Sequence, residues 1–208
     1  MRSLSFDESG LIPAIVQDAD GDAVLMLGYM SADSLAKTLE TGEVHFWSRS
    51  RGRIWRKGET SGNVLRAREI LVDCDLDCLL VRAVPLGPTC HTGARSCFFE
   101  RIDGSARTSS SLGDLVGRLV RTIRDRARSR PEGSYTAKLL ESGVERVAQK
   151  VGEEATEVVI AAAKTSRDAL AEESADLLYH LLVLWQAVGV TPEDVAGVLE
   201  TRHSGRKP

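Results

Sequence analysis

Residues 71–93, LVDCDLDCLLVRAVPLGPTCHTG, bring carboxylates and thiols together in one short segment. Asp73, Asp75 and Asp77 recur at every second position, and on a strand this spacing places them on one face. Three carboxylates that close repel one another unless a cation neutralises them, and hard oxygen ligands suit Mg²⁺. The pattern therefore predicts a magnesium site on a strand. The alternative is an acidic strand edge that discourages pairing with another sheet.

The cysteines of the same region indicate a second metal. Cys74, Cys90 and Cys97 could supply three thiolates, which would leave Zn²⁺ an open fourth position for water, as in catalytic sites. Free cysteines are also common as small buried hydrophobic residues, and the spacing matches no standard zinc-finger pattern. His91, next to Cys90, is a candidate general base, with a hydrogen-bonded structural histidine as the alternative.

Cations surround two tryptophans in HFWSRSRGRIWRKGETSG, residues 45–62. Guanidinium groups, hydroxyls and the N–H groups of a Gly-Glu-Thr-Ser-Gly loop are the donors that a phosphate group needs. The alternatives are a solvated hairpin tip or a surface on which single-stranded nucleic acid stacks.

Together these motifs resemble the phosphoribosyl-AMP cyclohydrolases, the ring-opening enzymes of histidine biosynthesis, over residues 10–100. The resemblance implies Mg²⁺ on Asp73, Asp75 and Asp77, and Zn²⁺ on Cys74, Cys90 and Cys97. It also implies a homodimer whose zinc ligands are shared between subunits, and hydrolysis of the N1–C6 bond of phosphoribosyl-AMP. The implied substrate contacts are Ser48, Arg51, Trp55, Lys57, Glu59, Thr60, Ser61 and Gly62.

A second set of carboxylates follows in two helix-like segments, VERVAQKVGEEATEVVIAAA and DALAEESADLLYHLLVLW. Glu154 and Glu157 lie beside the apolar stripe of the first, and Glu173 and Asp176 lie beside that of the second. If the helices pack together, the four carboxylates form a cluster that needs divalent cations. The alternative is a pair of amphipathic helices with acidic borders.

These segments resemble the all-α NTP pyrophosphatases, and specifically the phosphoribosyl-ATP pyrophosphatases, over residues 112–200. The resemblance implies Mg²⁺-assisted attack of water on the α–β phosphoanhydride, with Glu154 and Glu157 as catalytic residues and also, with Glu173 and Asp176, as metal ligands. Lys138 and Lys150 are the expected phosphate contacts.

The elements that position these residues fall into two groups. A hairpin around Asp20-Gly21, a helix from Ser31 to Gly42 and further strands predict an N-terminal α+β, mostly β, metal-binding domain at 1–104. A polar segment at 105–111 predicts a linker. Helical periodicity then predicts a C-terminal all-α domain at 112–208, with long helices near 142–164 and 167–188. The resemblance implies that this domain is NTP-pyrophosphatase-like.

The composition is ordinary for a globular protein, with 42% hydrophobic and 27% charged residues. The chain has 208 residues and a net charge of −3, which argues against a dedicated nucleic-acid binder. It has no signal-peptide-like or membrane-spanning run, so we expect a cytoplasmic protein without a membrane partner. The order of the two resemblances predicts a bifunctional enzyme that releases pyrophosphate first and opens the ring second. The alternatives are an NTP-sanitising pyrophosphatase with a regulatory zinc domain, and a metal-stabilised nucleic-acid-binding protein.

Overall fold

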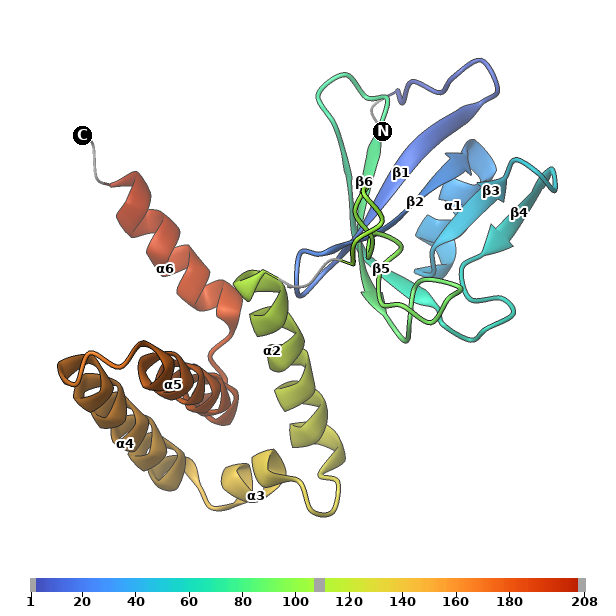
Figure 1. Ribbon diagram of the computed structural model, residues 1–208. Helices are drawn as coiled ribbons and strands as arrows, with labels where there is room; N and C mark the ends of the chain where they lie inside the picture. Colours follow the sequence, from blue (N-terminus) through green and yellow to red (C-terminus); the bar gives the residue numbers. More distant parts are fainter. Residues whose placement is uncertain (1–2, 107–110, 206–208) are drawn as a thin grey trace. The chain divides into compact units, whose positions relative to one another are not determined.

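The computed structural model describes residues 3–106 and 111–205 and divides into two compact units, Met1–Gly117 and Arg118–Pro208. The first unit is rich in strands and the second is helical, as the sequence predicts (Figure 1). Most of the predicted linker, at 107–110, lies outside the described residues, so the domain limits at 104 and 112 stay a prediction. No helix in the described part of the chain is long and apolar enough to span a membrane.

A four-stranded sheet with the order β2-β1-β6-β5 forms the centre of the first unit (Figure 1). Neighbours along the chain pair antiparallel, and β1 pairs parallel with β6. A separate hairpin consists of β3 and β4. The strands are β1 (Leu11–Asp18), β2 (Val24–Ser31), β3 (His45–Ser48), β4 (Arg53–Arg56), β5 (Leu65–Val72) and β6 (Leu79–Pro85).

Alternating apolar residues build the core of this unit. Ile12, Ala14 and Val16 on β1 are completely buried, as period-two alternation requires. Helix α1 (Ala32–Thr41) begins and ends where the sequence predicts. The Ser31 hydroxyl accepts a hydrogen bond from the Ser34 N–H at 3.2 Å, and Gly42 ends the helix with a φ of 69°.

The second unit contains only helices among its described residues (Figure 1). The two long helices α4 and α5 pack against each other, joined by a short turn whose Ser166 caps α5. The short helix α3 is absent from the elements predicted from the sequence. The helices are α2 (Leu112–Ser129), whose first residues belong to the first unit, α3 (Tyr135–Glu141), α4 (Val144–Ala163), α5 (Arg167–Val188) and α6 (Pro192–Ser204).

Gly28 on β2 is required by close packing against Phe46. A Cβ atom at this position would lie 2.5 Å from two carbons of the Phe46 ring, and this ring is completely buried. We therefore expect Gly28→Ala to reduce the free energy of unfolding by about 1–3 kcal/mol. Urea unfolding monitored by tryptophan fluorescence measures this change, because Trp55 lies beside Phe46 with ring centroids 5.4 Å apart.

Gly152→Ala is the matched control, because Gly152 is exposed on α4 and a Cβ there meets nothing within 4 Å. This variant should be stabilised by about 0.5–1 kcal/mol. An unchanged midpoint for Gly28→Ala would show that the Phe46 ring can move aside at no cost.

Candidate functional site

The acidic segment is a turn, and the prediction that it forms part of a strand is wrong. Residues 73–78 connect β5 to β6, and Leu76 has a φ of 69°, which no strand residue adopts. The Asp73 Oδ1 accepts hydrogen bonds from the N–H groups of Asp77 at 3.0 Å and Cys78 at 3.1 Å. The aspartate therefore satisfies the backbone of the turn with its own side chain, which favours a turn over continued strand pairing.

The turn nevertheless brings the three predicted carboxylates together. Asp73, Asp75 and Asp77 are exposed, and each has an oxygen within 4.8 Å of the others. The negative charge of Asp75 is the main cause that raises the pKa of Asp77 above its ordinary value. The donor set and its crowding fit a hard divalent cation; occupancy by Mg²⁺ stays a prediction.

A cavity of about 440 Å³ collects most of the other residues predicted for this unit. It lies between the segment that follows β3 and the loop that carries Cys90 and Cys97. Ser48 and Gly62 are not among the described residues that line it; the Ser48 hydroxyl instead accepts a hydrogen bond from the Arg51 Nε at 3.3 Å. The predicted residues that line the cavity are Arg51, Trp55, Lys57, Glu59, Thr60, Ser61, Cys90, His91 and Cys97.

Two thiols and a lysine meet in this cavity. The Thr92 hydroxyl donates to the Cys90 sulfur at 3.1 Å and is the main cause that lowers the pKa of Cys90. Burial, followed by the charge of Cys90, raises the pKa of Cys97. Burial lowers the pKa of Lys57, whereas the two thiolates act in the opposite direction. The Thr92 donor favours the thiolate form of Cys90, and the nearby Lys57 charge favours that of Cys97. The thiolate is the form that binds zinc.

Cys74 is separate from the other two predicted zinc ligands. It is exposed in the acidic turn, where its sulfur lies 3.8 Å from an Asp75 oxygen, and it does not appear among the described residues that line the cavity. One chain therefore brings together two of the three predicted thiols.

The cavity also contains residues that the motifs do not indicate. Thr89 is 3 % exposed, and its hydroxyl has no hydrogen-bond partner among the described residues. The sequence pointed to Thr89 only through its position directly before Cys90. The remaining residues of the lining are Met26, Asn63, Gly93 and Gly58, of which Gly58 begins the predicted Gly-Glu-Thr-Ser-Gly loop.

In the helical unit, α4 and α5 bring Glu154, Glu157 and Glu173 together, with oxygens within 4.8 Å of one another. Glu154 is buried, and its carboxylate lies 2.9 Å from the ammonium of Lys150. A hydrogen bond with Glu157 is the main cause that raises the pKa of Glu173, and the charge of Asp176 contributes. The structure therefore groups three of the four predicted carboxylates, and Asp176 lies outside this group, although its charge acts on Glu173.

The two predicted phosphate contacts differ in their surroundings. Lys150 binds Glu153 at 2.8 Å as well as Glu154, and these hydrogen bonds raise its pKa, that with Glu153 most. Lys138 is exposed on α3, and its role stays a prediction.

His180 is the residue of this site that sequence reasoning missed. It is 5 % exposed, and its Nδ1 lies 3.6 Å from the Glu154 carboxylate and 2.9 Å from the Asp176 carbonyl oxygen. Its Nε2 lies 3.2 Å from the Tyr135 hydroxyl. Helical spacing in the sequence could have indicated this residue. His180 follows Asp176 by four residues and Glu173 by seven, which places all three on the same face of one helix.

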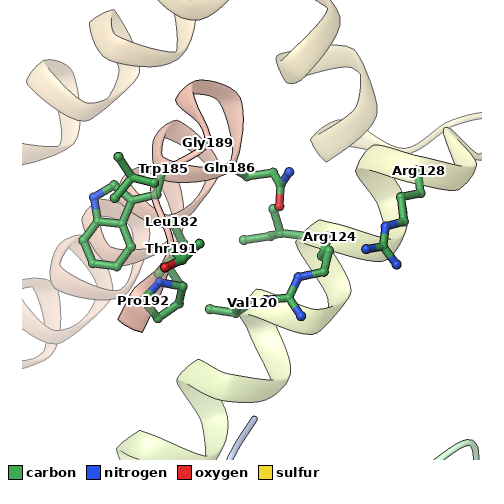
Figure 2. Close-up of a pocket in the computed structure, with 11 residues that line it drawn as sticks. Val120, Arg124, Arg128, Leu182, Trp185, Gln186, Gly189, Thr191 and Pro192 are labelled. Atoms are coloured by element: carbon green, nitrogen blue, oxygen red, sulfur yellow. The ribbon is translucent and has the colours of Figure 1, made fainter. Parts of the chain in front are cut away.

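The helical unit has a cavity of about 230 Å³ between α2 and α5 (Figure 2). Arg124 and Arg128 line it from α2, and Trp185 and Gln186 line it from α5. None of the residues that line it belongs to the predicted site, so the acidic cluster and this cavity are separate features of the unit.

The comparisons with known proteins assign the two parts of the chain. The family model for phosphoribosyl-AMP cyclohydrolase matches residues 26–99, and that for phosphoribosyl-ATP pyrophosphohydrolase matches residues 116–203. Three relatives, each described as histidine biosynthesis bifunctional protein HisIE, align over nearly the whole chain. The relative from Xanthomonas axonopodis pv. citri is 54% identical over 93% of this chain and 89% of its own length. The one from Thermus thermophilus is 45% identical over 100% and 96%, and the one from Bacillus subtilis is 49% identical over 97% and 95%. The chain therefore belongs to the bifunctional family of histidine biosynthesis in which a phosphoribosyl-AMP cyclohydrolase domain precedes a phosphoribosyl-ATP pyrophosphohydrolase domain.

Proposed function

We propose that this bifunctional enzyme carries out its two hydrolytic reactions at two separate metal-dependent sites, one in each unit. The helical unit would cleave phosphoribosyl-ATP to phosphoribosyl-AMP and pyrophosphate, and the β-rich unit would then open the adenine ring. The observation that carries the proposal is that each unit has its own cluster of three carboxylates. The relatives support this function over the NTP-sanitising and nucleic-acid-binding alternatives.

In the helical unit, the carboxylates of Glu154, Glu157, Glu173 and Asp176 would hold Mg²⁺, for which their hard oxygens and crowding are suited. Bound Mg²⁺ supplies positive charge that stabilises the phosphoanhydride as it breaks. Lys150 holds the buried Glu154 carboxylate in place at 2.9 Å. Glu157 is exposed and would accept the proton of the attacking water.

In the β-rich unit, the cavity is suited to bind an adenine nucleotide that carries a second ribose phosphate. Arg51 and Lys57 would bind phosphate groups, and Trp55 offers an aromatic face to the adenine ring. Cys90 and Cys97 would hold Zn²⁺, and bound Zn²⁺ supplies the Lewis acidity that makes water a nucleophile near neutral pH. His91 would move the proton that this attack releases. Asp73, Asp75 and Asp77 would hold Mg²⁺ at the acidic turn.

The proposal includes a homodimer. A zinc site with three thiolates needs Cys74, yet Cys74 lies in the acidic turn of the same chain, away from the cavity lining. Two copies that exchange this turn would complete both sites with one Cys74 each.

A cytoplasmic location also belongs to the proposal, because all four cysteines are free thiols and a reducing compartment keeps them so.

Loss of a cavity thiol should remove zinc and stop ring opening. For Cys90→Ser we expect the loss of about one zinc per chain. The ring-opening rate should fall by more than ~100-fold, because loss of a ligand costs more than the ~10–100-fold seen when a residue that supports a ligand is changed. Metal analysis and absorbance of the ring-opened product measure the two effects. Cys78→Ser is the matched control, because Cys78 does not belong to the described cavity lining. An active wild-type preparation that contains no zinc would contradict the proposal.

The acidic turn should determine how much Mg²⁺ the cyclohydrolase reaction requires. Asp75→Asn removes one charge at nearly constant shape, so half-maximal ring opening should need at least ~10-fold more Mg²⁺. Ring-opening rates at a series of Mg²⁺ concentrations test this expectation. Asp33→Asn, at an exposed position of α1, should leave the requirement unchanged. If Asp75→Asn also leaves it unchanged, the turn is an acidic edge and no metal site.

The two reactions should be separable in one chain. Glu154→Gln and Asp176→Asn should each reduce pyrophosphate release by on the order of 100-fold, because a cluster with one charge fewer holds Mg²⁺ poorly. Both variants should still open the ring of supplied phosphoribosyl-AMP at the wild-type rate. Glu145→Gln, at an exposed position of α4, is the control that should keep both activities. Joint loss of both activities in a folded variant would mean that the two reactions share one site.

A further inference from the structure

The loop that carries Cys90 and Cys97 is closed by hydrogen bonds at both ends. The Thr89 N–H donates to the Arg95 carbonyl oxygen at 3.2 Å, and the Cys90 N–H donates to the Ala94 carbonyl oxygen at 2.9 Å. The Cys97 N–H donates to the Leu25 carbonyl oxygen on β2 at 2.7 Å. Arg95 therefore lies where the two ends of the loop meet. Its carbonyl oxygen is bonded to Thr89, the residue before Cys90, and Arg95 itself precedes Cys97 by two positions.

The Arg95 side chain extends from this point to two buried carboxylates of the first unit. One guanidinium nitrogen lies 2.7 Å from the Asp18 carboxylate. The other donates to both oxygens of Asp114, at 2.7 and 2.8 Å. Asp18 is completely buried and Asp114 is 5 % exposed, so both charges are shielded from water, which strengthens their attraction to the guanidinium.

Asp18 is itself a rigid anchor. It is the last residue of β1, where it pairs with Ala83 of β6 in the parallel ladder. Its other oxygen accepts a hydrogen bond from the Asp20 N–H at 3.0 Å. Because Asp18 belongs to the sheet, its ion pair with Arg95 fixes Arg95 to the sheet. The backbone of the cysteine loop is fixed with it.

We propose that Arg95 is a positioning residue for the cyclohydrolase reaction, which fixes the separation and direction of the Cys90 and Cys97 sulfurs by tying their loop to Asp18 and Asp114. The inference rests on the proposed zinc site. The Arg95 side chain takes no part in ligation; it determines whether the two thiolates are already in place when the metal arrives. Preorganised ligands bind a metal more tightly, because less conformational freedom is lost on binding.

Arg95→Lys is the sharpest test. Lysine keeps the positive charge beside the buried carboxylates, but its single ammonium cannot reproduce the planar fork that spans two of them. Zinc affinity, measured by competition with a chromophoric chelator, should fall by ~10–100-fold. In the cobalt-substituted protein, the thiolate charge-transfer band should weaken or shift. At saturating zinc, the loss in ring opening should appear in kcat more than in KM, because the nucleotide contacts are intact.

Arg82→Lys is the matched control, since Arg82 forms ion pairs with Asp22 and Glu69 and lies outside the loop. Its zinc affinity and cobalt spectrum should equal those of the wild type. If Arg95→Lys fails to fold, Asp18→Asn addresses the same contact from the other side and should weaken zinc binding in the same way.

Wild-type zinc affinity and an unchanged cobalt spectrum in a folded Arg95 or Asp18 variant would overturn the positioning role, even if the thermal unfolding midpoint falls. A wild-type protein that binds no zinc would overturn the zinc site, and with it this inference. The two failures are distinguishable because only the second appears in the unmutated protein.

Discussion

Repulsion between carboxylates held a few ångströms apart is the constraint on which both sites depend. Each unit holds three of them with oxygens within 4.8 Å of one another. In each cluster one member has a raised pKa, Asp77 chiefly through the charge of Asp75 and Glu173 chiefly through a hydrogen bond with Glu157. The fold must supply enough stability elsewhere to hold such groups together, and a bound cation would remove the cost.

The two units meet the constraint in different ways. In the β-rich unit, the β5–β6 ladder forces a tight connection, and Asp73 satisfies the N–H groups of that connection while its neighbours remain exposed. In the helical unit, two long helices pack side by side and present acidic pairs at a spacing of three residues. There Lys150 offsets part of the charge at 2.9 Å from Glu154.

The cavity of the β-rich unit depends on a different balance, between thiols and cations. Lys57 is 8 % exposed and lies near Cys90 and Cys97, so burial disfavours its charge while the thiolates favour it. The loop that carries these cysteines has few apolar residues of its own to pack into the core. The backbone hydrogen bond from Cys97 to β2, the Ser96 hydroxyl bonded to β2 and the Arg95 ion pairs hold it instead. Rigid support from a neighbouring sheet is what a loop needs if it is to present metal ligands accurately.

The sequence by itself determined the two-part organisation, the β1–β2 hairpin, the limits of α1 and the long helices, because these depend on local periodicity, caps and turn residues. It also determined which residue types could bind metals and phosphate. Only the tertiary structure decided that Asp73–Asp77 form a turn, because alternation is compatible with a strand until the pairing of β5 with β6 leaves those residues unpaired. Likewise, the separation of Cys74 from Cys90 and Cys97 depends on contacts between distant segments. Such contacts leave no periodic trace in the chain, and so they appear only when the elements have packed.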